Sequence, residues 1–137
     1  MTNQHRPLHT WLLRVAALVA VLFGVATVVS GARVLFGGAT AQQAAGAYVP
    51  WVLWFNTLAG LVYIAAGIGL ALRRAWAGRL SAALAVASVL VFAALGMHIA
   101  LGGAYEARTV AAMALRCTFW IGLAWFAARS SASSMAR

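Results

Sequence analysis

The chain alternates between long apolar stretches and short polar ones. Four apolar stretches stand out, namely Val15–Phe36, Trp51–Leu72, Leu80–Leu101 and Thr109–Ala128. At about 1.5 Å of rise per residue, a helix over any of them reaches about 30 Å, the thickness of the hydrocarbon core of a bilayer. Strands of a membrane barrel would be about half as long and would alternate polar with apolar residues. The pattern therefore predicts four transmembrane helices.

The segments between and beyond these stretches are too short to hold a soluble domain. The first loop, Gly37–Pro50, is rich in glycine, alanine and glutamine and carries no charge, which predicts a flexible or re-entrant surface segment. The first apolar stretch has some features of a cleaved signal peptide, but it is longer than a usual signal core, so a retained helix is expected. Residues 1–137 are expected to form a single membrane domain.

Composition supports the same fold class. Hydrophobic residues make up 65% of the chain and charged residues 8%, against roughly half and about a quarter in soluble domains. A disordered chain is excluded as well, because it would need more polar and charged side chains to stay solvated. We therefore expect an all-α polytopic membrane protein, built as a bundle of four transmembrane helices.

The charged residues predict an orientation. All 10 basic residues are arginines, Glu106 is the only acid, and the net charge is +9. Because the arginines are scattered between apolar stretches rather than gathered on one face, no nucleic-acid partner is predicted. Most of them lie in the two tails and the second loop: Arg6, Arg14, Arg73, Arg74, Arg79, Arg129 and Arg137. The positive-inside rule then places both termini in the cytoplasm, with the chain in a bacterial inner membrane.

Arg116 is the most informative polar residue because it falls inside the fourth apolar stretch. It lies about 12 Å from Arg108 along a helix, and a central arginine costs at least about 2.5–3.5 kcal/mol on insertion scales. Arg116 is therefore expected to face the bundle interior or a hydrated cavity, where Trp120 could stack on the guanidinium. A structural arginine bonded to the carbonyls of neighbouring helices is the alternative.

Glu106 is the one available acidic counter-ion, and two placements are open. It approaches Arg116 if the loop containing Gly102 and Gly103 folds into the bundle, which two adjacent glycines permit. It pairs with Arg108 at the surface if the loop does not fold inward.

Polar residues gather at one level of the expected bundle. In the predicted orientation, the outer half of the membrane or the space above it holds Arg33, Asn56, Tyr63, His98, Glu106, Arg108 and Arg116. Together with Trp120 they are the candidate ligand-binding residues of an outward-opening pocket. Because three arginines outnumber one glutamate, the pocket is expected to prefer an anionic or carbonyl ligand, such as a lipid, a quinone or a small anion.

The sequence does not indicate a catalytic or metal site, and it identifies no cofactor. There is no carboxylate pair and no base placed beside a serine. Met113 and Cys117 are soft ligands, but Arg116 would repel a cation beside them. Cys117 is the only cysteine, which excludes an intrachain disulfide and a two-cysteine redox motif. Haem on His98 would require a second axial ligand from another subunit.

Two function classes follow from these observations. The first is a non-enzymatic binding or accessory subunit of a larger membrane complex, with its ligand in the outer-leaflet pocket. The alternative is a small homo-oligomeric transporter with Arg116 on the substrate path. In both cases the expected partners are the lipid bilayer and other membrane proteins. These would be further copies of this chain in a homo-oligomer, or different proteins in a larger membrane complex. A purely structural assembly protein is a third possibility, and it would tolerate substitution of Arg116 and His98 together.

Overall fold

The structure is a computed structural model that describes the backbone of residues 5–135 and the side chains of residues 11–129. Its described part holds five helices: α1 (His5–Phe36), α2 (Gly38–Ala45), α3 (Pro50–Ala71), α4 (Ala75–Ala100) and α5 (Ala107–Met135). All but α2 are long and apolar enough to cross a membrane, over Trp11–Phe36, Pro50–Ala71, Ala75–Ala100 and Ala107–Arg129. The predicted fold class, an all-α bundle with four membrane-spanning helices, is confirmed.

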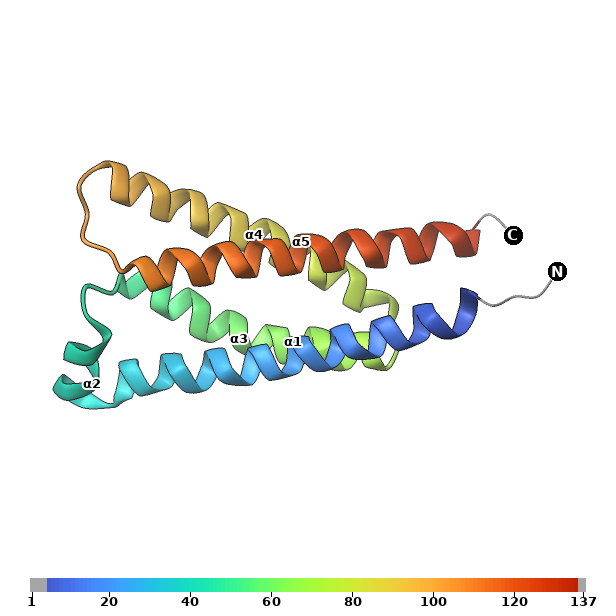
Figure 1. The fold of residues 1–137 in the computed structure, drawn as a ribbon, viewed down its shortest axis with the longest axis horizontal. Coiled ribbons are helices and arrows are strands. Elements are labelled where there is room, and N and C mark those ends of the chain that lie inside the picture. Colours follow the sequence, from blue (N-terminus) through green and yellow to red (C-terminus); the bar gives the residue numbers. More distant parts are fainter. Residues whose placement is uncertain (1–4, 136–137) are drawn as a thin grey trace.

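The long helices run antiparallel to their neighbours along the chain (Figure 1). α1 packs mainly on α3, α5 packs mainly on α4, and α3 also contacts α4. Helix α2 and the α4–α5 loop lie at one end of the bundle, which we call the α2 end. Both termini and the α3–α4 turn lie at the other end, which we call the terminal end. α1 and α5 diverge toward the α2 end (Figure 1).

Two short turns reverse the chain between the long helices. Gly102 follows α4 with a φ of 83°, and the Gly103 N–H donates to the His98 carbonyl at 2.9 Å. This left-handed conformation is open to glycine without steric cost, so it ends α4 cleanly. After α3, Arg73 adopts a φ of 53° and the Arg74 N–H donates to the Gly69 carbonyl at 2.8 Å.

Glycines bring α1 and α3 into close contact. A Cβ added to Gly60 would lie 2.8 Å from Val28 Cγ2 and 3.0 Å from the Gly24 carbonyl oxygen. Farther along α3, a Cβ on Gly67 would lie 2.8 Å from the Ala17 carbonyl oxygen. Small residues at these positions let the two backbones approach, as is typical of helix pairs in membranes.

The core has a large aromatic cluster in the middle of the bundle. The Phe23 and Tyr63 rings stack with centroids 5.9 Å apart, and the Tyr63 and Trp120 centroids are 4.8 Å apart. Phe119 packs on Trp120 at 5.2 Å. A second apolar cluster lies nearer the α2 end and contains Val49, Val52, Leu95 and Met113. Many large apolar side chains on α1 and α4 are exposed, as a lipid-facing surface requires.

The structure corrects the predicted element bounds. Gly37–Pro50, the predicted flexible or re-entrant surface segment, contains the helix α2, and none of the residues of α2 is buried. α1 begins at His5, ten residues earlier than predicted. α4, the third of the predicted membrane helices, begins at Ala75 rather than Leu80. These helices extend beyond the hydrocarbon-length stretches because polar end residues can continue a helix into water. Of the arginines used for the orientation, Arg6 and Arg137 have side chains outside the described residues.

Candidate functional site

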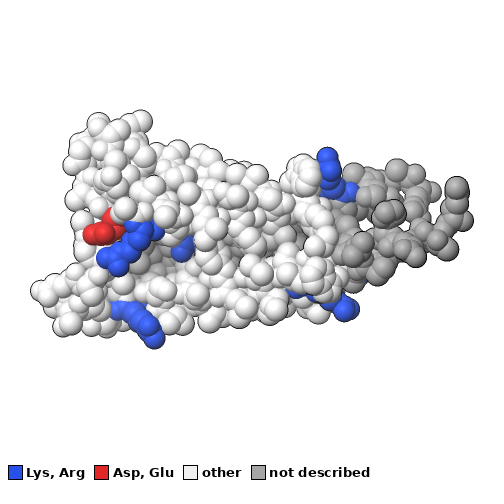
Figure 2. Space-filling view, viewed as in Figure 1, with Lys and Arg blue, Asp and Glu red and all other residues white. Residues whose placement is uncertain are grey.

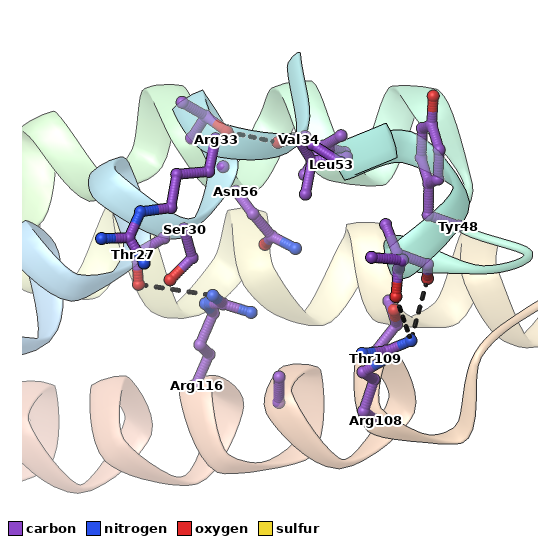
Figure 3. A pocket seen from close by; sticks show the side chains of 16 residues that line it. Thr27, Ser30, Arg33, Val34, Tyr48, Leu53, Asn56, Arg108, Thr109 and Arg116 are labelled. Carbon is purple, nitrogen blue, oxygen red and sulfur yellow. Dashed lines mark hydrogen bonds between the residues drawn. The ribbon is translucent and has the colours of Figure 1, made fainter. Parts of the chain in front are cut away.

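A cavity of about 600 Å³ opens between α1, α2, α3 and α5 at the α2 end. Figure 3 shows Arg116 and Arg108 entering it from α5, Arg33 from α1 and Asn56 from α3. Its remaining lining is a mixture of small, hydroxyl-bearing and apolar residues: Thr27, Ser30, Gly31, Val34, Ala41, Ala44, Ala45, Tyr48, Leu53, Thr57, Thr109 and Ala112. α4 contributes no lining residue to this cavity.

Arg116 lies at the inner limit of this cavity and is 8% exposed. It is on the same buried face of α5 as Met113 and Trp120, which places it inside the bundle. One of its terminal nitrogens donates to Thr27 Oγ1 at 3.3 Å. Its Nε is buried and has no hydrogen-bond acceptor among the described residues. A guanidinium has five N–H donors, so Arg116 keeps donor capacity for a ligand or water in the cavity.

The predicted stacking of Trp120 on Arg116 is not what the structure shows. The guanidinium carbon of Arg116 lies 5.4 Å from the centroid of the Phe23 ring. Trp120 is fully buried against Tyr63 and Phe119 instead. Helical spacing correctly predicted that Arg116 and Trp120 share one side of α5, but it does not reveal that Phe23 of α1 faces the arginine.

Asn56 is the polar residue that α3 contributes to the cavity. It is 8% exposed, and its Oδ1 has no hydrogen-bond donor within the described part of the chain. The adjacent Thr57 hydroxyl is already used, because it donates to the Leu53 carbonyl at 2.8 Å. An unsatisfied amide in a buried position is costly, so Asn56 also favours a polar occupant.

Tyr63 and Trp120 do not line the cavity, although both were candidate ligand-binding residues. They lie in the aromatic cluster, and the Tyr63 hydroxyl is within interaction range of Ser88 and the Trp120 indole. None of these three polar groups forms a hydrogen bond of normal geometry in the described structure. Tyr63, Ser88 and Trp120 therefore belong to the protein core, where their polar groups are surrounded by apolar side chains.

Glu106 and Arg108 hold α2 against the start of α5. Arg108 donates to the carbonyls of Ala44 and Ala45 at 3.2 and 3.1 Å, and Glu106 Oε1 accepts from the Ala47 N–H at 2.8 Å. We call this set of contacts the α2 clamp. The two side chains also pair with each other, with 3.8 Å between Arg108 Nε and Glu106 Oε2. The surface pair therefore forms, and the alternative placement of Glu106 against Arg116 does not.

His98 lies apart from the cavity. Its Nε2 is 3.1 Å from the Ala104 carbonyl oxygen, within the α4–α5 loop. A Cβ on Gly103 would overlap the imidazole ring, so the ring packs directly on the loop backbone. The histidine thus shapes the turn, and it does not line the cavity with the arginines.

The charge of the cavity is one-sided. Arg33, Arg108 and Arg116 line it, and no carboxylate does. Figure 2 shows basic side chains toward both ends of the molecule, a charge-free middle, and the single acidic residue beside basic atoms at the α2 end. Arg116 is buried, whereas Arg33 and Arg108 are exposed at the cavity. Arginine forks attract carboxylate, phosphate or carbonyl oxygens, and most strongly where the local dielectric is low, as around Arg116.

The described residues form no group of three or more histidine, cysteine or acidic side chains of the kind that holds a metal ion. Comparison with protein-family models, curated protein sequences and solved structures gave no match. The chemistry of the cavity is therefore the basis for a proposed function.

Several lining residues were not singled out from the sequence, notably Thr27, Ser30, Tyr48 and Thr57. A usable signal was present on α1, because Thr27, Ser30 and Arg33 follow one another at helical spacing and share a face. The contributions of α2 had no such signal, since its lining residues are alanines.

Proposed function

We propose that the chain is an integral membrane binding or accessory subunit that holds an anionic or carbonyl ligand in the cavity at the α2 end. Its proposed setting is a bacterial inner membrane, with the α2 end facing outward and both termini in the cytoplasm. The observation that carries the proposal is the convergence of Arg33, Arg108 and Arg116 on one cavity that no carboxylate lines.

The energetics of Arg116 support an occupied cavity. A charged side chain inside a bilayer is retained where it pairs, bonds to carbonyls or meets water. In the described structure Arg116 has the Thr27 hydroxyl and the face of Phe23, and it has no acidic partner. An oxyanion or carbonyl oxygen in the cavity would accept from the remaining N–H groups and offset the cost of burying the charge.

The aromatic cluster favours binding over transport. Phe23, Tyr63 and Trp120 fill the bundle on the terminal side of Arg116, with adjacent ring centroids 5.9 and 4.8 Å apart. The cavity thus ends at a packed layer instead of continuing toward the terminal end. A substrate path through one chain would require this layer to rearrange, whereas a binding site needs no such change.

The proposal is tested by native mass spectrometry of the protein extracted gently from bacterial membranes, compared with the Arg116→Ala and Arg74→Ala variants. Arg74 lies in the α3–α4 turn at the terminal end, so it is a matched loss of one arginine away from the cavity. We expect a bound small molecule on the parent and on Arg74→Ala, and its loss from Arg116→Ala. Equal occupancy in all three proteins would remove the proposal. The same spectra report unlike partner chains or homo-oligomers, and a visible spectrum reports any coloured ligand.

A further inference from the structure

The side chains of Arg33 and Arg116 lean toward the same level of the bundle. Side chains on a helix point toward its N-terminus. α1 begins at the terminal end and α5 begins at the α2 end. Arg33 therefore leans inward along α1 and Arg116 leans outward along α5. In Figure 3, Arg33 extends back toward Thr27, the residue that accepts a hydrogen bond from Arg116.

The third arginine of the cavity is already committed to the protein. Arg108 is engaged in the α2 clamp through the carbonyls of Ala44 and Ala45 and through Glu106. By contrast, no described residue accepts a hydrogen bond from the guanidinium of Arg33, and among the described residues only Thr27 accepts one from the guanidinium of Arg116. The donors that remain for a ligand thus belong to Arg33 and Arg116.

Two guanidinium forks from opposite walls suit a single oxyanion. Each fork can donate to a carboxylate or phosphate in a bidentate manner. Thr27, Ser30 and Asn56 surround the same space with hydroxyl and amide groups. A neutral carbonyl has one oxygen to offer to two cationic groups, whereas a phosphate or carboxylate offers several acceptor positions and compensates the charge.

The residues around Arg33 and Arg116 indicate that the ligand also carries an apolar group next to its oxyanion. α2 covers the outer end of the cavity with Ala41, Ala44 and Ala45, and the α2 clamp holds it there. The cavity also has apolar walls at Val34 and Leu53. On the flanking helices, Val29 of α1 and Leu115 of α5 are exposed apolar side chains. An ion that carries an apolar chain can enter between α1 and α5 from the bilayer without displacing α2.

We infer that Arg33 and Arg116 together bind the phosphate or carboxylate of an amphiphile, with its apolar chain lying between α1 and α5. This inference rests on the proposed function and narrows it, because it names the ligand class and assigns two of the three arginines to it. It also separates the role of Arg108, which positions α2, from ligand binding.

The test measures binding of three probes by native mass spectrometry of the purified protein in dodecyl maltoside micelles. Dodecyl phosphate carries the oxyanion and the chain, inorganic phosphate lacks the chain, and decylubiquinone replaces the oxyanion with carbonyls. We expect saturable binding of one dodecyl phosphate, weakened about tenfold or more by Arg33→Ala and by Arg116→Ala. Arg74→Ala should bind like the parent, and inorganic phosphate should compete poorly.

The outcomes separate the inference from the proposed function. If inorganic phosphate competes as well as dodecyl phosphate, or decylubiquinone alone binds, the amphiphilic oxyanion is wrong while the arginine cavity still binds a ligand. If no probe binds, both ideas fail. If Arg116→Ala does not fold, Arg33→Ala decides, because that side chain is exposed and its loss leaves the core unchanged. Unchanged affinity in Arg33→Ala overturns the two-arginine site.

Discussion

Arg116 combines a large cost of burial with few partners, and a single hydroxyl is its hydrogen-bond acceptor in the described structure. Thr27 reaches it from the opposite helix at 3.3 Å. That contact fixes the side chain at the inner limit of the cavity, while the Nε is buried and has no acceptor among the described residues. A cavity at this depth has room for water or a polar ligand that would solvate this one charge.

Removing the Thr27 hydroxyl should destabilise the protein through Arg116. The Thr27→Val variant keeps the shape of the side chain but takes away the acceptor of the hydrogen bond. We expect the free energy of unfolding, measured by denaturant titration in bicelles, to fall by about 1 kcal/mol. Thr118→Val is the control, because the exposed Thr118 hydroxyl donates only to the Ala114 carbonyl of its own helix. Equal losses in the two variants would contradict a special role for Thr27.

For single residues, the sequence predicts the depth in the bilayer and the helix face better than it predicts which side chains will be in contact. The insertion cost of arginine and the helical spacing brought Arg33, Asn56, Arg108 and Arg116 together, and they line one cavity. The same reasoning could not show that Tyr63 and Trp120 belong to the aromatic cluster, because it does not specify which helix lies opposite. The rotation of neighbouring helices is set by packing between them, and a single sequence carries little record of it.

Helix α2 is an element held in place by polar contacts rather than by burial. None of its residues is buried, so it gains little from apolar packing. Gly46, which follows it, has a φ of 72° and approaches the Glu106 carboxylate so closely that a Cβ would overlap it. The position of α2 therefore depends on the α2 clamp.

Loss of the Glu106 carboxylate should release α2 without unfolding the bundle. In Glu106→Ala, the Ala47 N–H loses its acceptor and Arg108 loses its ionic partner. We expect amide hydrogen exchange in residues 38–48 to become about tenfold faster, measured by mass spectrometry, while exchange in the long helices stays unchanged. Gln42→Ala, on the exposed surface of α2, is the matched control. If α2 exchanges as slowly in Glu106→Ala as in the parent, the clamp does not hold it.

The contact between α1 and α3 should depend on glycine at position 60. In Gly60→Ala the new methyl group would meet Val28 Cγ2 and the Gly24 carbonyl oxygen at 2.8 and 3.0 Å. Because one of these atoms is backbone, the helices must separate, and we expect a loss of about 1–3 kcal/mol in unfolding free energy. Gly96→Ala on α4 meets nothing within 4 Å and should be neutral or slightly stabilising. A neutral Gly60→Ala would show that the two helices are free to move apart.

Among the helices, the length of the apolar stretches predicted the four long ones and did not predict α2. The four long helices follow from stretches of hydrocarbon thickness, and their bounds differ where polar residues such as Arg14 and Arg79 continue a helix beyond the apolar core. In α2, the segment Ala41–Ala45 consists of alanine and glutamine, which are good helix formers. That signal is weak in so short a segment, since an isolated helix of this length is not stable in water. The tertiary contacts of Glu106 and Arg108 supply the missing stability.

As a whole, the molecule has two unlike ends. The α2 end carries the cavity, Glu106 and the three arginines that line the cavity, while other described arginines lie toward the terminal end (Figure 2). Aromatic residues lie toward both ends, with Phe36 packed on Trp54 at the α2 end at 6.2 Å and Arg129 over Trp125 toward the terminal end at 4.0 Å. Such belts mark the two membrane interfaces. The accessibility of the cavity depends on which end faces which compartment.

The positive-inside rule predicts that the α2 end faces outward, and cysteine labelling can test it in whole cells. Cys117 is the only cysteine and is buried, so Cys117→Ala gives a background with no reactive thiol. Single cysteines would then be placed at Thr40 on α2 and at Ala75 at the start of α4, both exposed and at opposite ends of the bundle. A membrane-impermeant maleimide should label Thr40→Cys in intact cells and label Ala75→Cys only after permeabilisation. The reverse pattern would place the cavity toward the cytoplasm, and its ligand would then come from the inner leaflet.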